Sequence, residues 1–577
     1  MRAGRHSDMH AIAHDMEPDD PMRSAKPPAA GRLGVPSAGG RLPEKVRGLA
    51  RSMAAARAVM MAVLGAAMIL GPAPAASAAP PAGDEIFYLI FVRSFRDSNG
   101  DGKGDLKGIE QELGYLQGLG VTTVVLTPLY QSPFYHSYFA TDFSRIDPAY
   151  GTEADFRSLV QALHRRGMRI FIDQEVQYVA ADHEWFRDSL GNPDSRYGRY
   201  ILYNGPGNTQ PESAELPSYD GKKILVATVN MHEPAVLEYQ TRLFEHWMNP
   251  TGAGADDGVD GFRIDHMMDD LDQSGKLTGL FARFWSPMFR RLRDENPRIR
   301  ILAEQADWGS YGDDWFSRGN VDMVYAFRIR WAIAALDKKQ LVEAVNETWR
   351  RTPAGRQQLV FVENHDTNRF ATEVGGDARR ERLGACLNLL LRGIPLIYYG
   401  QELGVEGRQG HWMSDGNDIP VRQAFPWTVG AGPGIAAWYR DTGPWWAQSA
   451  LALGSSISLD REAGRPGSLL SYYKALIALR RTHPELVSGD QAIAENDSAS
   501  VFSFVRSDGA HQILVAANLA GSPVTAHVRI GGAAPAPRSA SLHDVFTGGL
   551  VARGADGGFA VTLQGYGVSI DEVSAGN

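Results

Sequence analysis

Short runs of apolar and β-branched residues alternate with longer segments of helical periodicity from residue 85 onward. Eight runs predict buried strands, and they span residues 86–92, 121–126, 168–173, 259–264, 299–303, 321–325, 359–362 and 395–398. Segments such as 152–166 and 234–248 predict intervening helices. This alternation predicts the α/β class and favours a (β/α)8 TIM barrel. The pattern alone also permits an open doubly wound sheet, but no G-x-G-x-x-G motif or P-loop follows an early strand.

Two segments interrupt the alternation. Residues 182–228, between the third and fourth strands, are rich in Asn, Pro, Gly, Ser and Tyr and predict a small inserted subdomain. Residues 405–467, after the eighth strand, contain many Gly, Pro and Trp residues and predict a loop over the rim of the barrel. The barrel, with its insertion after strand three, is therefore expected to span residues 79–485.

The C-terminal part has a different pattern. After an amphipathic helix at 468–481, short apolar runs separated by Gly and Pro turns occupy residues 500–505, 512–518, 524–530 and 559–563. Such runs are typical of antiparallel sheets. We expect a C-terminal β-sandwich over residues 486–577.

The N-terminal part has the features of an export signal. Residues 59–70 are apolar, follow Arg51 and Arg57, and lead to Ala76-Ser77-Ala78, which has the small-x-small form of a signal-peptidase site. The run is shorter than the about 20 residues of a membrane span. We therefore predict a signal peptide at 53–78, a secreted or periplasmic product and no stable membrane insertion after cleavage; an uncleaved amphipathic anchor is the alternative. Residues 1–52 lack periodicity and are expected to be disordered or to precede the true start at Met53.

Composition and charge exclude several classes of protein. Of the 577 residues, 44% are hydrophobic and 22% charged, which excludes a wholly disordered chain and a multispan membrane protein. The net charge is −9, and residues 1–80 hold ten Lys and Arg against six acids. The acidic remainder therefore predicts no nucleic-acid partner. The single cysteine, Cys386, excludes an intramolecular disulfide and is expected to be buried in a helix.

Acidic residues stand at the ends of four predicted strands. Asp173 ends the third, Asp265 and Glu304 follow the fourth and fifth, and His365 and Asp366 follow the seventh. The carboxyl ends of barrel strands meet at one mouth, where catalytic sites are built. Carboxylates that converge there repel each other, so one is held protonated while others stay ionised, as an acid and a nucleophile of a glycosidase require.

At these residues the sequence resembles the α-amylase family of retaining glycoside hydrolases. The resemblance covers residues 85–577 and rests on several motifs together, including a match to the family's eighth strand at 393–402. They are FxRSFxDSNGDGxGDLxGI at 91–109, IDPxYGT at 146–152, GxDGFRxD at 258–265, the Glu after strand five and NHDxxR at 364–369.

The resemblance implies a role for each catalytic carboxylate. Asp265 would be the nucleophile that forms a covalent glycosyl intermediate, and Glu304 would protonate the leaving oxygen and then activate water. Asp366 would hold the sugar hydroxyls as the ring distorts. Arg263 would keep Asp265 ionised through its fixed charge.

Further residues are expected to bind substrate. His365 would hydrogen-bond the same hydroxyls as Asp366, and Tyr138 would stack on the apolar face of glucose, unless it only packs within its aromatic loop. Asp173, Tyr178 and Arg369 complete the predicted substrate-binding set.

Residues 97–105 place oxygen donors at every second position, which suits a hard cation. The segment begins like an EF-hand, but Gly108 stands where the EF-hand requires Glu. The resemblance implies a structural Ca²⁺, with an acidic turn without metal as the alternative. Its ligands would be Asp97, Asn99, Asp101, the carbonyl of Lys103 and Asp105.

The chain departs from the family after strand three. The usual Asp-x-x-x-Asn-His is here Asp173 to Tyr178, with Gln177 in place of Asn. The family's Asn helps to bind a second Ca²⁺, so Gln177 leaves the presence of that second site open. The family's His touches the glucose 6-hydroxyl, and the Tyr178 hydroxyl could donate a hydrogen bond in its place. His266 leaves the linkage preference open. Phe139 replaces the Asp of relatives that trim single glucoses, which favours amylase-like cleavage.

These features predict a monomeric, exported hydrolase of starch or maltooligosaccharides that cleaves α-glucosidic bonds by double displacement with retention. The same residues would serve an enzyme that transfers the glycosyl unit to a sugar or isomerises a disaccharide. A noncatalytic sugar-binding protein is disfavoured because Asp265, Glu304 and Asp366 are all present.

Overall fold

The computed structural model of the chain describes residues 84–252, 254, 257–531 and 539–574. The predicted signal peptide at 53–78 and the leader at 1–52 lie outside the described residues. Within the described ranges, no helix combines the length and the apolar character needed to cross a bilayer.

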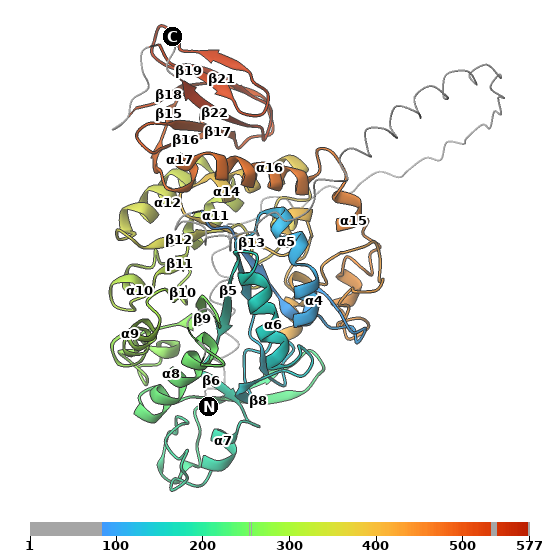
Figure 1. Cartoon of the computed structure of the whole chain (residues 1–577), viewed down its shortest axis with the longest axis vertical. Coiled ribbons are helices and arrows are strands. Elements are labelled where there is room, and N and C mark those ends of the chain that lie inside the picture. The colour runs from blue at the N-terminus through green and yellow to red at the C-terminus, as the bar shows by residue number, and fades with distance from the viewer. Residues whose placement is uncertain (1–83, 253, 255–256, 532–538, 575–577) are drawn as a thin grey trace, which may run out of the picture. The chain divides into compact units, whose positions relative to one another are not determined.

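Eight parallel strands close into a barrel in the order β1-β13-β12-β11-β10-β9-β5-β2 (Figure 1). Every predicted strand is present, so the predicted TIM barrel is confirmed, and pairing of the first strand with the last excludes the open sheet. The strands are β1 (Phe87–Ile90), β2 (Thr123–Leu126), β5 (Arg169–Gln174), β9 (Gly261–Met267), β10 (Arg300–Gln305), β11 (Met323–Tyr325), β12 (Gln357–Val360) and β13 (Ile394–Tyr398). Strand β9 extends three residues beyond its prediction and therefore includes Asp265.

Helices cover the outside of the barrel (Figure 1). The principal ones are α4 (Leu106–Gln111), α5 (Leu113–Leu119), α6 (Glu153–His164), α8 (Pro234–Met248), α9 (Ser286–Glu295), α11 (Phe327–Ala335), α12 (Lys338–Arg351), α14 (Ala378–Leu390) and α16 (Leu469–Thr482). A capping box between Thr152 and Asp155 starts α6. Cys386 is buried in α14, as predicted. Short helices α3 (Val92–Phe95), α10 (Asp313–Ser317) and α13 (Phe370–Glu373) lie near strand ends.

The insertion after β5 forms its own small sheet. Strands β6 (Tyr178–Ala180), β8 (Lys223–Thr228) and β7 (Ser213–Pro217) pair in that order, and α7 (Glu184–Ser189) precedes β7. The segment after β13 contains only short helices, including η4 (Gln401–Leu403), η5 (Asp415–Val421) and α15 (Leu459–Glu462). Both segments therefore differ from the regular strand–helix repeat, as their composition predicts.

Two antiparallel sheets form the C-terminal part. One has the order β14-β16-β17-β22-β19-β20 and the other β15-β18-β21, and they share a core that includes Val501, Leu514, Val528 and Phe559. The four predicted strands correspond to β16 (Val501–Ser507), β17 (Gln512–Asn518), β18 (Val524–Arg529) and β21 (Phe559–Leu563). The sequence did not predict β14 (Asp490–Ile493), β15 (Glu495–Asn496), β19 (Ser541–Asp544), β20 (Leu550–Ala552) and β22 (Val568–Ser574).

Two fully buried arginines connect these sheets and α16 to the end of α14. Arg506 on β16 donates to the Leu390 carbonyl at 3.0 Å. Arg480 on α16 donates to the carbonyls of Leu389 and Gly393 at 2.9 and 2.8 Å. The carbonyls that α14 leaves free at its C-terminus are thus satisfied by side chains from the C-terminal part of the chain.

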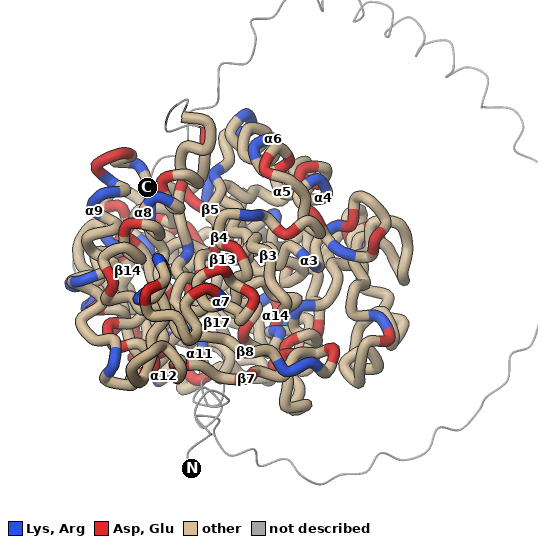
Figure 2. Tube along the Cα trace, turned by 90° about the horizontal axis from the view of Figure 1, so that it is seen from below, with Lys and Arg blue, Asp and Glu red and all other residues tan. Residues whose placement is uncertain are grey.

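Charged residues of both signs lie interspersed along the described chain. Figure 2 shows Lys and Arg next to Asp and Glu over the side that it presents, without a continuous basic stripe.

Candidate active site

One buried guanidinium joins three carboxylates at the carboxyl end of the barrel. Arg263 on β9 donates from Nη1 to both oxygens of Asp173 at 2.9 Å and also to Asp265 Oδ1, and from Nη2 to Glu304 Oε2 at 2.7 Å. The side chains come from three adjacent strands, β5, β9 and β10. The structure thus brings together residues that lie far apart in the sequence.

Close packing of the strands positions this group. Gly261 begins β9 beside Phe171 of β5, and a Cβ at Gly261 would lie 2.2 Å from the Phe171 ring. The glycine of the GxDGFRxD motif therefore permits the close approach of β5 and β9. Asp173 and Arg263 pair in the register of these strands.

Burial raises the pKa of all three carboxyl groups. Removal from water lifts the pKa of Asp173, Asp265 and Glu304 to about 6 each, and in each case the Arg263 charge opposes the rise. Mutual repulsion among the carboxylates adds to it. The mouth of the barrel can therefore hold a protonated and an ionised carboxyl group near neutral pH.

Glu304 has donors on both of its oxygens. Trp308 Nε1 donates to Oε1 at 3.1 Å, and the backbone N–H of His266 donates to Oε2 at 3.2 Å. Oε2 also accepts a hydrogen bond from Arg263, so Oε1 has fewer hydrogen-bond donors around it. No sequence motif predicted the contacts of Trp308 and His266.

Tyr138 and His365 connect the Arg263 group to Asp366. The Tyr138 hydroxyl donates to Asp173 Oδ2 at 2.9 Å and lies 2.6 Å from His365 Nε2. The two rings stack, with their centroids 5.8 Å apart. His365 Nε2 is also 3.0 Å from Asp366 Oδ2.

Arg422, which sequence reasoning missed, anchors Asp366 from the opposite side. It is buried in the loop after β13, donates from Nη2 to Asp366 Oδ1 at 2.8 Å and from Nε to the His365 carbonyl at 2.9 Å. Nη1 donates to the Tyr135 hydroxyl at 2.9 Å. Arg422 Nη2 also lies 3.1 Å from Asp418 Oδ2. Nothing in the local sequence marks this arginine, because Asp366, His365 and Tyr135 precede it by more than 50 residues.

Tyr178 and Gln177 lie where the insertion leaves β5. The Tyr178 hydroxyl donates to Asp272 Oδ1, in the segment after β9. Gln177 is fully buried, and its side-chain amide donates to the carbonyls of Asp265 and His266 at 2.7 and 3.1 Å. Gln177 therefore touches the strand that carries Asp265.

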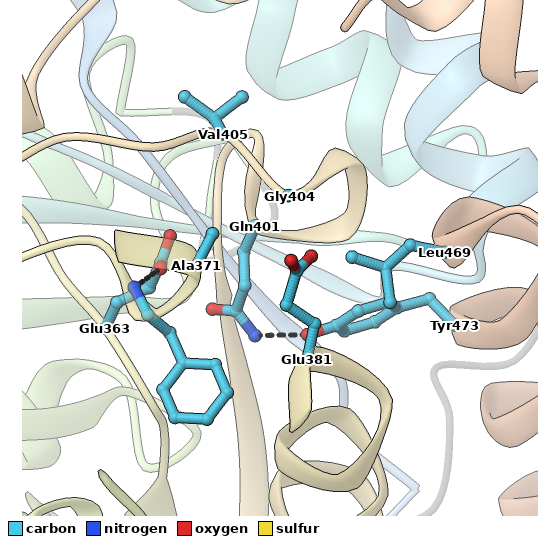
Figure 3. A pocket seen from close by; sticks show the side chains of 9 residues that line it. Glu363, Ala371, Glu381, Gln401, Gly404, Val405, Leu469 and Tyr473 are labelled. Carbon is cyan, nitrogen blue, oxygen red and sulfur yellow. Dashed lines mark hydrogen bonds between the residues drawn. The ribbon is translucent and has the colours of Figure 1, made fainter. Parts of the chain in front are cut away.

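Arg369 does not join the Arg263 group. It is fully buried, donates from Nη1 to Glu363 Oε1 and to the Tyr399 carbonyl, each at 2.8 Å, and lies over the Tyr398 ring at 4.0 Å. Glu363 also lines a cavity of about 10 Å³, room for one water, beside Gln401 and Tyr473 (Figure 3). Arg369 thus contacts residues behind the mouth rather than the three carboxylates.

The loop predicted to bind calcium is organised by its own backbone. Asp97 accepts N–H groups of Gly100 and Gly102 at 2.7 and 2.8 Å, and Asp105 accepts that of Ser98 at 2.9 Å. The side chains of this loop offer oxygen atoms, the ligands that a hard cation prefers. Among the described residues, three acidic or histidine ligand atoms converge within 4.8 Å only at Glu485, Asp508 and His511, so the loop carboxylates are not drawn together.

Residues 89–277 and 315–489 match the family model of the α-amylase catalytic domain. The chain is 27% identical over 449 residues to α-amylase 3 of Dictyoglomus thermophilum, an alignment that covers 75% of this chain and 84% of that protein. It is 28% identical over 465 residues to a 4-α-glucanotransferase of Thermotoga maritima, over 76% of this chain and 96% of that protein.

A solved structure has the same architecture. The crystal structure of an α-amylase from H. orenii superposes with a TM-score of 0.69 at 27% identity and covers 85% of this chain and 99% of that chain. The likeness therefore includes both the barrel and the C-terminal sheets.

Proposed function

We propose, since the chain belongs to the α-amylase family, that it is an exported hydrolase that cleaves α-glucosidic bonds of starch or maltooligosaccharides with retention of configuration. The observation that carries this proposal is the sharing of one guanidinium by Asp265 and Glu304. Two carboxyl groups bound to the two terminal nitrogens of Arg263 lie close together. This arrangement suits a nucleophile and a general acid that flank the scissile glycosidic bond.

In the first step, ionised Asp265 attacks the anomeric carbon while protonated Glu304 gives its proton to the glycosidic oxygen, and the carbon–oxygen bond breaks. Oε1 of Glu304 carries this proton, because Oε2 already accepts hydrogen bonds from Arg263 and the His266 N–H. In the second step, Glu304 takes a proton from water, which attacks the anomeric carbon and releases Asp265.

Asp366 and His365 bind the sugar hydroxyls in this proposal. Arg422 and Tyr138 hold both side chains at the mouth. Because ring distortion moves the hydroxyls, a carboxylate fixed from two sides favours the distorted ring over the relaxed one.

Transfer to a sugar is the second candidate, and the 4-α-glucanotransferase relative favours it. The residues at the mouth are the same for both outcomes, since only the acceptor of the glycosyl group differs. A structural Ca²⁺ held by the 97–105 loop completes the proposal; its oxygens suit the ion, and it would brace the loop between α3 and α4.

Product analysis separates these outcomes. Maltotriose is incubated with the enzyme, and the products are resolved by chromatography with their anomeric form read by NMR. Hydrolysis yields glucose and maltose with retained configuration, whereas transfer yields oligomers longer than maltotriose. Inverted products would contradict the proposed mechanism. Asp265→Asn should abolish turnover on all substrates, while Glu304→Gln should retain more activity on an aryl glucoside, whose leaving group needs little protonation.

A further inference from the structure

Gln177 makes three hydrogen bonds with its side-chain amide in a fully buried position. Nε2 donates to the carbonyls of Asp265 at 2.7 Å and His266 at 3.1 Å, and Oε1 accepts the backbone N–H of Val176 at 2.8 Å. Since Val176 offers only a donor and the two carbonyls only acceptors, the orientation of the amide is determined.

The turn that presents this amide is held by Glu175. Glu175 Oε1 accepts the backbone N–H groups of Gln177 at 2.6 Å and Tyr178 at 3.1 Å, and the residue is buried. Both ends of the Gln177 contact are thus fixed, one by β5 and its turn and the other by β9.

The two carbonyls that Gln177 binds flank His266. This residue has a φ of 45°, in the left-handed region, which costs a residue with a side chain about 1 kcal/mol or more. Its N–H points at Glu304 Oε2, 3.2 Å away. A backbone in this conformation persists only where its surroundings hold it.

We propose that Gln177 is a positioning residue for the reaction: its amide ties the carbonyls on both sides of His266 to the turn after β5, and so fixes Asp265 and the N–H that His266 gives to Glu304. This inference rests on the proposed function. Gln177 itself does not touch the substrate. It acts through the backbone of β9, the strand that carries the nucleophile.

The test compares Gln177→Ala with Gln358→Ala in the full-length enzyme. Gln358 is a matched control, because it is buried on β12 and its amide likewise donates to a carbonyl, that of Tyr311, at 3.0 Å. With maltoheptaose, Gln177→Ala should lower kcat about 10- to 100-fold, with KM within about threefold of the wild type. Gln358→Ala should keep kcat within about twofold once activity is normalised to the folded fraction.

Substrate and pH identify the route of the effect. The loss of kcat on Gln177→Ala should be smaller with α-glucosyl fluoride than with maltoheptaose, because fluoride departs without a proton from Glu304. Gln177→Glu replaces only the amide nitrogen by an oxygen, so that a carboxyl oxygen faces the carbonyls of Asp265 and His266. Its activity relative to the wild type should rise as the pH falls, because the protonated acid regains one donor.

A wild-type kcat for Gln177→Ala, or a loss no larger than that of Gln358→Ala, would overturn the inference and leave the proposed function intact. A wild-type enzyme that neither hydrolyses nor transfers glucan units would instead overturn the proposed function, and the inference with it. The two failures are distinguished by the wild-type measurement alone.

Discussion

Arg422, which is buried, and Asp366, which is half-buried, form an ion pair with Nη2 and Oδ1 2.8 Å apart. The acid lies in a motif that the sequence displays, and the arginine lies in the irregular segment after the last barrel strand. A loop that carries no recognisable motif thus fixes the orientation of a residue expected to bind the substrate.

Replacement of Arg422 by Met should lower kcat/KM about 10- to 100-fold, because Asp366 loses a charged partner that holds it at the mouth. It should also lower the free energy of unfolding by about 1–3 kcal/mol, since the half-buried Asp366 carboxylate is left with one partner fewer. Kinetics with maltoheptaose and urea unfolding measure the two effects. Arg461→Met, at an exposed position of the same segment, is the control and should change neither quantity. Unchanged kinetics in Arg422→Met would show that the pair has no catalytic consequence.

The pH profile of kcat/KM should be a narrow bell centred near pH 6. Activity requires ionised Asp265 and protonated Glu304, and burial raises the pKa of each to about 6. Activity therefore rises with pH as Asp265 ionises and falls as Glu304 loses its proton. In Glu304→Gln, assayed with an aryl glucoside, the falling limb should disappear. A falling limb that persists in this variant would assign it to another group.

Glu175→Gln should change how stability depends on pH. Burial and the charge of Asp265 raise the pKa of Glu175 well above its ordinary value of 4.5. The folded state therefore binds the proton more tightly than the unfolded state, and wild-type stability falls as the pH rises above 4.5. Between pH 4.5 and the pKa of Glu175 in the folded state, the free energy of unfolding of the variant relative to the wild type should therefore increase by about 1.4 kcal/mol per pH unit.

Thermal unfolding from pH 4 to pH 8 measures this difference. Glu215→Gln, at an exposed position of β7, should follow the wild type. Parallel curves for Glu175→Gln and the wild type would mean that Glu175 keeps an ordinary pKa in the folded protein.

Ca²⁺ should raise the melting temperature of chelator-treated protein by several degrees, because an ion that binds only the folded state stabilises it. Asp97→Ala should abolish this gain, measured by thermal unfolding and calorimetry. Asp508→Ala is the matched control, since Asp508 belongs to the other acidic group that offers three ligand atoms. Loss of the gain in Asp508→Ala but not in Asp97→Ala would move the ion to that group.

The barrel could be predicted from the sequence because its strands are buried on both faces. Strands such as β1 and β13 consist of buried residues throughout, so they form continuous apolar runs. In contrast, β20 is apolar but only three residues long and mostly exposed, and β22 contains Asp571 and Glu572, so neither forms a long buried apolar run. These strands exist because neighbouring strands pair with them, which a local pattern does not display.

The candidate site was only partly visible for a similar reason. Asp173, Asp265 and Glu304 lie at the carboxyl ends of strands, and topology alone brings such positions to one mouth. Arg369 shares a motif with Asp366 but points to Glu363, since a motif specifies residues and not the direction of their side chains. Gln177 looked like a departure from a family pattern, and only the fold places its amide against the nucleophile strand.

The buried contacts of Arg480 and Arg506 with the end of α14 bear on how the chain can be shortened. Removal of the C-terminal sheets would take away Arg506 and leave the Leu390 carbonyl without its donor. The C-terminal sheets therefore contribute to the stability of the barrel. A barrel without them would lose a hydrogen bond that satisfies the C-terminal end of α14. Barrel and sheets should melt in a single cooperative transition.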